Sequence, residues 1–153
     1  MILDRFIKKI HKIYTMMNTI NMQGMRYLNL FEKITGVRTR FYFEYNNTIM
    51  FCVPRSFLSK ALGKNNQNLK KMSDIIKKRI RIVPNPRGIQ DARNFIQAIV
   101  NPLTFKSLRV KDDEIILTAG NQSKAALLGR DKRRLNEMQK IIKDFFEVDF
   151  KII

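Results

Sequence analysis

The stretch Ala-Leu-Gly-Lys-Asn-Asn-Gln-Asn-Leu-Lys-Lys, residues 61–71, places a glycine and a run of amide side chains between two segments of helical apolar spacing. No proline interrupts the second segment, so one helix is expected to end at Gly63 and the next to begin almost at once. Residues 127–135, Leu-Leu-Gly-Arg-Asp-Lys-Arg-Arg-Leu, have the same layout, and Gly129 follows Gly63 by 66 positions. The spacing predicts an internal repeat.

The repeat extends well beyond the two glycines, because an offset of 66 aligns apolar positions and turn signals along each unit. The aligned pairs are Leu62 with Leu128, Leu69 with Leu135, Ile75-Ile76 with Ile141-Ile142, Ile80 with Phe146, Ile82 with Val148, Ile49 with Ile115, and Asn46-Asn47 with Asp112-Asp113. In the first hairpin strand, Phe41 and Phe43 are out of phase with Leu108 and Val110. This mismatch indicates a difference in strand register between the repeats.

Each repeat contains signals for six elements in the order helix, strand, strand, short helix, helix, strand. The expected ranges are 25–34, 37–45, 49–53, 56–62, 67–78 and 79–83 in the first repeat, and 89–100, 105–111, 114–119, 122–128, 132–145 and 147–152 in the second. In the strand 79–83, basic residues alternate with Ile80 and Ile82, which predicts one solvated cationic face. A unit of about 60 residues is marginal alone, so the repeats are expected to bury a shared face.

The predicted domain organisation is a pair of units, 24–83 and 89–153, joined by the linker Pro-Asn-Pro-Arg-Gly at 84–88 and preceded by residues 1–23. The N-terminal segment has apolar residues at helical spacing and basic residues largely on the opposite face, which predicts an amphipathic helix. Packing on the core or on a partner is the expected role of this helix. The alternatives are adsorption to a membrane surface and a translation start at a later methionine.

Composition points to a polyanionic partner. The 153 residues include 30 basic and 13 acidic side chains, for a net charge of +17, and residues 24–85 alone carry 13 basic and three acidic side chains. Nucleic acid is the natural ligand of such a chain. No segment approaches the roughly 18 consecutive apolar residues of a membrane helix, and the N-terminus does not resemble a secretory signal. A cytoplasmic protein is therefore expected.

Several classes of chemistry are disfavoured by residue type. Cys52 is the single cysteine and His11 the single histidine, which excludes an internal disulfide and paired-histidine metal ligation and makes a catalytic triad improbable. Asp112-Asp113-Glu114 is a tight acidic cluster, but its counterpart Asn46-Asn47-Thr48 marks it as a hairpin turn. We expect no catalytic residues, no metal site, no cofactor and no small-molecule substrate.

The element order, with a glycine between adjacent helices, resembles the type II KH domain, an RNA-binding module with a G-x-x-G loop at that junction. Two such units in tandem resemble the archaeal NusA-like transcription factors over about residues 24–153. Two short segments are also similar in sequence to that family, Met-Arg-Tyr-Leu-Asn-Leu-Phe-Glu at 25–32 and Phe-Phe-Glu-Val-Asp at 145–149. The resemblance implies an α+β fold of two tandem type II KH domains, each a three-stranded sheet with helices packed on one face.

A helix break at glycine exposes backbone N–H groups to an approaching phosphate, and nearby cations add salt-sensitive attraction. The candidate RNA-binding residues are Gly63, Lys64, Asn65, Asn66, Lys70, Lys71, Gly129, Arg130, Lys132, Arg133 and Arg134. Both loops depart from the family pattern, since Asn66 and Lys132 replace the second glycine. Asparagine tolerates a left-handed backbone better than lysine does, and Asp131 adds a negative charge. The second loop is therefore expected to be the weaker site.

The resemblance implies a non-enzymatic protein that binds nascent single-stranded RNA near RNA polymerase and acts in transcription elongation or termination. One alternative is an interaction protein that docks by its basic face on a ribosome or polymerase assembly while its loops serve only as turns. A third class, a nucleic-acid-processing enzyme using Asp112 and Asp113, would require both carboxylates in a cleft with a divalent ion.

Overall fold

The computed structural model describes residues 3–5 and 22–153, so the amphipathic helix expected within residues 1–23 lies almost entirely outside the described residues. The elements of the first repeat are α2 (Met22–Thr35), β1 (Phe41–Tyr45), β2 (Thr48–Val53), η1 (Arg55–Phe57), α3 (Leu58–Leu62), η2 (Lys64–Asn66), α4 (Gln67–Ile76) and β3 (Arg79–Pro84). The elements of the second are η3 (Ile89–Asp91), α5 (Ala92–Val100), β4 (Ser107–Lys111), β5 (Glu114–Thr118), α6 (Lys124–Leu128), η4 (Arg130–Lys132), α7 (Arg133–Phe146) and β6 (Asp149–Ile152).

Each repeat builds its own three-stranded sheet, in the orders β1-β2-β3 and β4-β5-β6. The first two strands of each sheet are antiparallel, and the third runs parallel to the second. The parallel pairing follows from chain order, because two helices intervene before the third strand and return the chain to its starting edge. The α+β class and the order α-β-β-α-α-β are thus confirmed, and the arrangement fits a pair of KH-like units.

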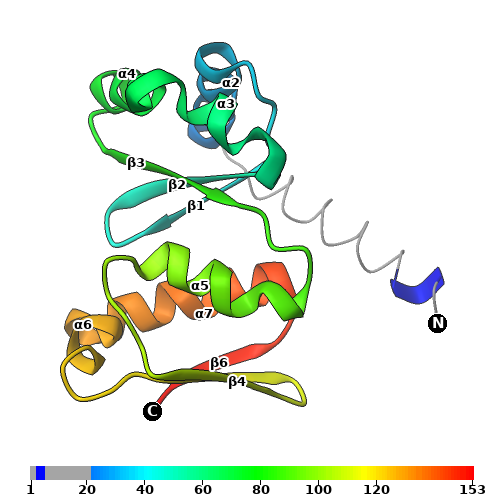
Figure 1. Ribbon diagram of the computed structural model, residues 1–153, viewed down its shortest axis with the longest axis vertical. Coiled ribbons are helices and arrows are strands. Elements are labelled where there is room, and N and C mark those ends of the chain that lie inside the picture. The colour runs from blue at the N-terminus through cyan, green and yellow to red at the C-terminus, as the bar shows by residue number, and fades with distance from the viewer. Residues whose placement is uncertain (1–2, 6–21) are drawn as a thin grey trace.

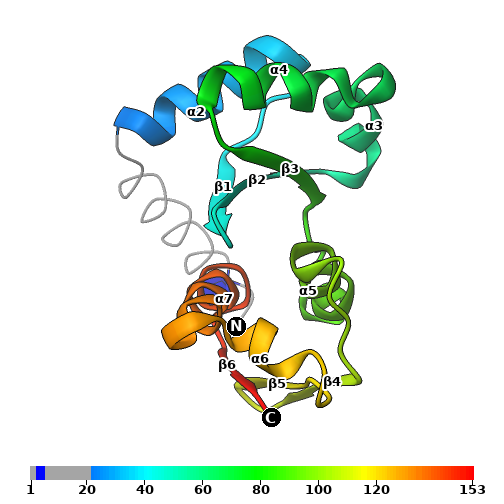
Figure 2. The same ribbon diagram turned by 90° about the vertical axis from the view of Figure 1, so that its left-hand side faces the viewer.

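The two units stack into four layers, helices on sheet on helices on sheet (Figure 1). Helices α2, α3 and α4 cover one face of the first sheet, while α5 and α7 lie between the two sheets (Figure 2). All six residues of β2 are buried. Alternate β2 side chains join different clusters, Ile49, Phe51 and Val53 with their own helices and Met50 and Cys52 with the second unit. The expected shared face is present.

The predicted register difference between the repeats is wrong. Phe41 pairs with Cys52 and Ser107 with Thr118, so both hairpins keep the same register at an offset of 66. The aromatic residues are out of phase because they occupy the other face of the sheet, where Phe43 packs against Phe95 of α5 at a ring-centroid distance of 6.2 Å. The corresponding face of the second sheet is open to solvent and carries Ser107, Arg109 and Lys111. The phase shift marks the interface between units.

The offset of 66 also fails after the last helix. Helix α7 has 14 residues and α4 has 10, a difference of about one helical turn. Consequently Ile80 corresponds to Phe150 and not to Phe146, as shown by their equivalent partners Ile49 and Ile115 in the central strands. A whole extra turn keeps the apolar face of the helix in place, so the apolar pattern alone did not reveal the insertion.

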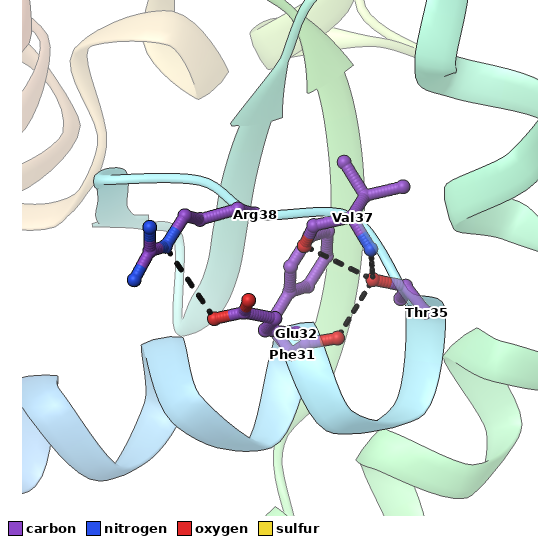
Figure 3. Close-up of polar contacts among 5 residues, drawn as sticks. All are labelled: Phe31, Glu32, Thr35, Val37 and Arg38. Atoms are coloured by element: carbon purple, nitrogen blue, oxygen red, sulfur yellow. Dashed lines mark hydrogen bonds and ion pairs between the residues drawn. The ribbon is translucent and has the colours of Figure 1, made fainter.

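Helix α2 stops where the sequence predicted. The N–H of Gly36 donates to the carbonyl of Glu32, and Gly36 has a φ of +72°, a left-handed conformation that suits glycine. The Thr35 hydroxyl donates to the Phe31 carbonyl at 2.7 Å and accepts from the N–H of Val37 at 3.0 Å (Figure 3). These bonds turn the chain from the helix into β1, and Phe31 stacks on Phe51 of β2.

Candidate nucleic-acid interface

The two glycine loops have nearly the same backbone. Gly63 has φ 74° and ψ 176°, and Gly129 has φ 76° and ψ 170°. Asn66 and Lys132, which stand where the family pattern has its second glycine, are both left-handed, with φ values of 57° and 59°. Asparagine is among the residue types that adopt this conformation most readily. Lys132 takes the same conformation, although a left-handed backbone is uncommon for lysine.

The first glycine of each loop is required by packing. A Cβ atom on Gly63 would lie 2.8 Å from Nδ2 of Asn68, which crosses the glycine to donate to the carbonyl of Ala61 at 3.0 Å. A Cβ atom on Gly129 would lie 2.9 Å from the backbone nitrogen of Arg134. Arg134 occupies the position equivalent to Asn68 and likewise donates to a carbonyl of the preceding helix, that of Ala126. In both loops a side chain from the long helix therefore caps the short helix.

The loop backbones remain open to a ligand. The N–H groups of Lys64 and Asn65 have no hydrogen-bond acceptor among the described residues. The N–H groups of Arg130 and Asp131 in the second loop also lack one there. All four residues are exposed. Two adjacent free N–H groups on a turn form a site that favours an anion such as a phosphate oxygen. The first loop adds the charge of Lys64, whereas the second combines Arg130 with the carboxylate of Asp131.

The cations near the two loops differ in how they are engaged. Lys64, Lys70 and Lys71 are exposed, and none forms an ion pair with another residue of the described chain. In the second loop, Arg130 and Lys132 are likewise exposed. Arg133 and Arg134 instead reach across to the first unit, as described next. The structure therefore leaves the cations of the first loop available and fixes two of those grouped around the second.

A polar contact ties the second loop to the hairpin turn of the first unit. Arg134 donates to the Asn46 side chain at 2.7 Å and Arg133 to that of Asn47 at 3.3 Å. Glu137 completes the contact by accepting from the N–H of Asn46 at 3.2 Å. The neighbouring Tyr45 is buried, and that burial raises its pKa to about 12. Sequence reasoning missed this contact, because nothing local indicates that the turn of one repeat meets the loop of the other.

The predicted solvated cationic face of β3 is only partly correct. Arg79 is exposed, but the Arg81 guanidinium donates to the carbonyls of Ala98, Ile99 and Asn101 at the end of α5. Burial lowers the pKa of Arg81. A cation at the C-terminus of a helix interacts favourably with its dipole and satisfies carbonyls that lack helical partners. Arg81 therefore joins the two units.

A cleft of about 710 Å³ lies between the units. The first unit contributes Leu69, Lys70, Ser73 and Asp74 of α4, residues 79–81 of β3, and residues 45, 46, 48 and 50 of the first hairpin. The second unit contributes residues 99–103, at the end of α5 and just after it, and Arg134. No sequence signal indicated it, because it is assembled from five separate segments.

The acidic cluster at residues 112–114 forms a hairpin turn, as predicted. Asp112 and Asp113 lie exposed at the turn between β4 and β5, and Glu114 pairs with Lys151 at 3.5 Å. Within residues 3–5 and 22–153, no His, Cys, Asp and Glu side chains gather as a group of three that could hold a metal ion. Cys52 is buried, and burial raises the pKa of its thiol. The helices of the same residues are too short or too polar to traverse a bilayer.

Comparisons with known proteins give a sequence relative and a structural neighbour. A probable transcription termination protein NusA of Methanococcus vannielii is 27% identical over 92 residues, which are 60% of this chain and 51% of that protein. The match thus spans about half the length of this relative. The crystal structure of APE1850 aligns with a TM-score of 0.61 over 88% of this chain and 99% of that one, at 18% identity, which is evidence of a common fold. No family model matches the chain.

Proposed function

We propose that this protein is a non-enzymatic, NusA-like protein of two tandem type II KH units that binds single-stranded RNA. Its expected place is transcription elongation or termination, on nascent RNA close to RNA polymerase. The likeness to a probable NusA protein supports the transcriptional setting, and the net charge of +17 supports a polyanionic ligand.

The observation that carries the proposal is the first loop. Its exposed N–H groups at Lys64 and Asn65 and its cation at Lys64 lie at the start of α4, where the helix dipole also favours an anion. Such a loop holds the sugar-phosphate backbone of an unpaired strand, and the adjoining helix and strand contact the bases. Gly63 by itself is weaker support, because packing against Asn68 already requires it.

The second loop is proposed as an auxiliary site. Its backbone is equivalent, but Asp131 repels phosphate, and Arg133 and Arg134 hold the hairpin turn of the first unit. Because these bonds give the second loop a structural role, they also favour a second candidate function. In that function both loops act as structural turns, and the protein docks on a large assembly. The two candidates differ in whether RNA binding depends on the first loop.

The test is fluorescence anisotropy with a 5′-labelled ten-nucleotide oligouridylate across a salt series. The variant Lys64→Asp/Asn65→Asp places two carboxylates where the phosphate is expected. It should preserve the loop, since Asp131 already adopts φ 55° and ψ 30° at the position of Asn65. We expect at least about a tenfold loss of affinity, consistent with losing a charge-assisted contact and adding repulsion.

Two matched variants complete the design. Arg130→Asp creates the same pair of carboxylates in the second loop, and we expect a loss of no more than about threefold. Lys111→Glu/Ser107→Glu makes the same change in net charge on the open face of the second sheet, at the opposite end of the stack (Figure 1). If this distant control weakens binding as much as the first-loop variant, RNA is attracted only by overall charge and the docking function is preferred.

A further inference from the structure

We propose that the free edge of β4 binds an extended segment of a partner protein in which acidic and apolar residues alternate. Strand β4 lies at one edge of the second sheet, at the end of the stack that the second unit forms (Figure 1). Within the part of the chain that the structure describes, β5 is the only strand that pairs with it. Alternate residues of an edge strand direct N–H and C=O groups away from the sheet, where an added strand can pair with them. None of the β4 residues belongs to a glycine loop or lines the cleft between the units.

The helices of the second unit leave β4 largely uncovered. Four of its five residues are exposed, and the fifth, Leu108, is half-buried. Val110 alternates with the outward-facing Arg109 and Lys111, so it lies on the helix-facing side of the sheet. Its side chain is nevertheless 49% exposed. Leu108 and Val110 therefore form an apolar strip beside the free edge.

Strand β1 occupies the equivalent edge of the first sheet but is protected. The two hairpins share one register at an offset of 66, so the position of Val110 is taken by Glu44. Glu44 is exposed and pairs with Lys78 at 3.4 Å. A charge on the inward side of an edge strand opposes pairing with a further strand. The other side of β1 is closed because Phe43 packs against Phe95. Strand β4 lacks both forms of protection.

The outward side of β4 sets the charge of the partner. Arg109 and Lys111 lie on the open face of the sheet, and Lys106 precedes the strand. Residues 105–111 include no acidic side chain. None of these three cations forms an ion pair with another residue of the described chain. The carboxylate directly opposite Lys111, that of Glu114, is engaged in a different ion pair. A strand added to β4 would thus meet unpaired cations on one side and the apolar strip on the other.

This combination favours a peptide strand over RNA or a second copy of the chain. The free N–H and C=O groups match the main chain of another strand, and the two-residue spacing of the apolar strip matches alternating side chains. RNA has no repeating N–H and C=O groups to match them. A second copy would place its own Lys106, Arg109 and Lys111 against the same cations, which repel each other. The partner segment is therefore expected to present carboxylates to the open face and aliphatic side chains to the apolar strip.

The experiment uses the full chain and a fluorescein-labelled peptide of eight alternating valine and glutamate residues, followed by fluorescence anisotropy. A control peptide with four valines followed by four glutamates has the same charge without the alternation. We expect the alternating peptide to bind at least about fivefold more tightly than this control. The variant Arg109→Glu/Lys111→Glu should weaken its binding at least about tenfold. The same variant should bind a peptide of alternating valine and lysine more tightly than the native chain does, a gain that misfolding cannot produce.

Val110→Glu tests the apolar strip without changing the cations. It gives β4 the residue type that protects β1, and it should weaken binding of the alternating peptide about fivefold or more. Val110→Ile is the matched control and should leave the affinity unchanged. Equal binding of the two valine–glutamate peptides, or no effect of Val110→Glu, would overturn the inference.

Two further measurements separate the other occupants. If Val110→Glu weakens binding of the ten-nucleotide RNA as much as binding of the peptide, the edge is an RNA site and the inference is overturned. If the native chain is a dimer in sedimentation equilibrium and Val110→Glu is a monomer, a second copy occupies the edge and the inference is again overturned. We expect a native monomer and unchanged RNA binding. Because RNA binding is assigned to the first loop, failure at β4 leaves the proposed function standing.

Discussion

Replacing Arg81 with methionine should destabilise the whole protein. The guanidinium donates to the carbonyls of Ala98, Ile99 and Asn101, which end α5 and have no helical partner of their own. Hydrogen bonds from a charged donor contribute about 1.5–3 kcal/mol each when isolated. These three share one donor, and Arg81 is only half-buried, so we expect a combined loss of about 2–3 kcal/mol in the free energy of unfolding.

Urea denaturation followed by circular dichroism measures this loss. Because Met50, Cys52 and Val83 of the first unit share one apolar cluster with α5 and α7, both units should unfold in a single transition. Arg79→Met, two positions earlier and exposed, is the matched control and should change stability by less than about 0.5 kcal/mol. Equal effects of the two variants would refute the assignment of Arg81 as the polar link between the units.

Three further predictions follow from buried groups and close contacts. The pKa of Tyr45 in the folded protein is raised to about 12. Tyr45 should therefore stabilise the fold below pH 10, and this contribution should disappear as pH rises toward 12. In thermal melting at a series of pH values, Tyr45→Phe should remove this part of the pH dependence. Gly63→Ala and Gly129→Ala should each lower the free energy of unfolding by about 1–3 kcal/mol, measured by thermal unfolding. Both positions have a positive φ, and an added Cβ atom would collide with the residue five positions later. Phe43→Ala should cost about 3–5 kcal/mol because it opens a cavity between the units, whereas Arg109→Ala at the equivalent open position should be nearly neutral in the same assay.

The order of helices, strands and turns could be predicted because each depends on residues that are close together in the sequence. The glycine stops at 36, 63 and 129, the asparagine and aspartate turns, and the alternation of apolar residues fixed the order of elements and their approximate bounds. The helix 67–78 was placed two residues too long because Lys77 takes a left-handed φ of 64° and ends it early. A lysine gives no signal for such an ending, which glycine and asparagine usually mark.

What the sequence did not reveal lies between the repeats. Phe41 and Phe43 pack against Phe145 and Phe95 of the other unit, and their phase was therefore misread as a register shift. Arg81 was interpreted as solvent-facing because alternation distinguishes two faces of a strand but not what covers each face. The cleft depends on the same long-range packing. The candidate loop residues, by contrast, were located from the repeat alone, and the structure shows which of them already have partners.

The asymmetry between the loops leads to a last prediction. Asn46 and Asn47 have φ values of 52° and 56°, a pair of left-handed residues that glycine can replace without strain. Asn46→Gly/Asn47→Gly should therefore keep the turn while removing the side-chain acceptors of Arg134 and Arg133. Released from the first unit, these cations become available to phosphate.

The expected result is a steeper salt dependence of ten-mer RNA binding, by about 0.7 for each cation that gains a phosphate. Arg133 is the better candidate, because Arg134 keeps its bond to the carbonyl of Ala126. The triple variant that also carries Arg133→Ala should return the slope to its native value. An unchanged slope in the double variant would mean that the second loop does not face the RNA. The weakness of that loop would then follow from its position in the stack and not from the engagement of its arginines.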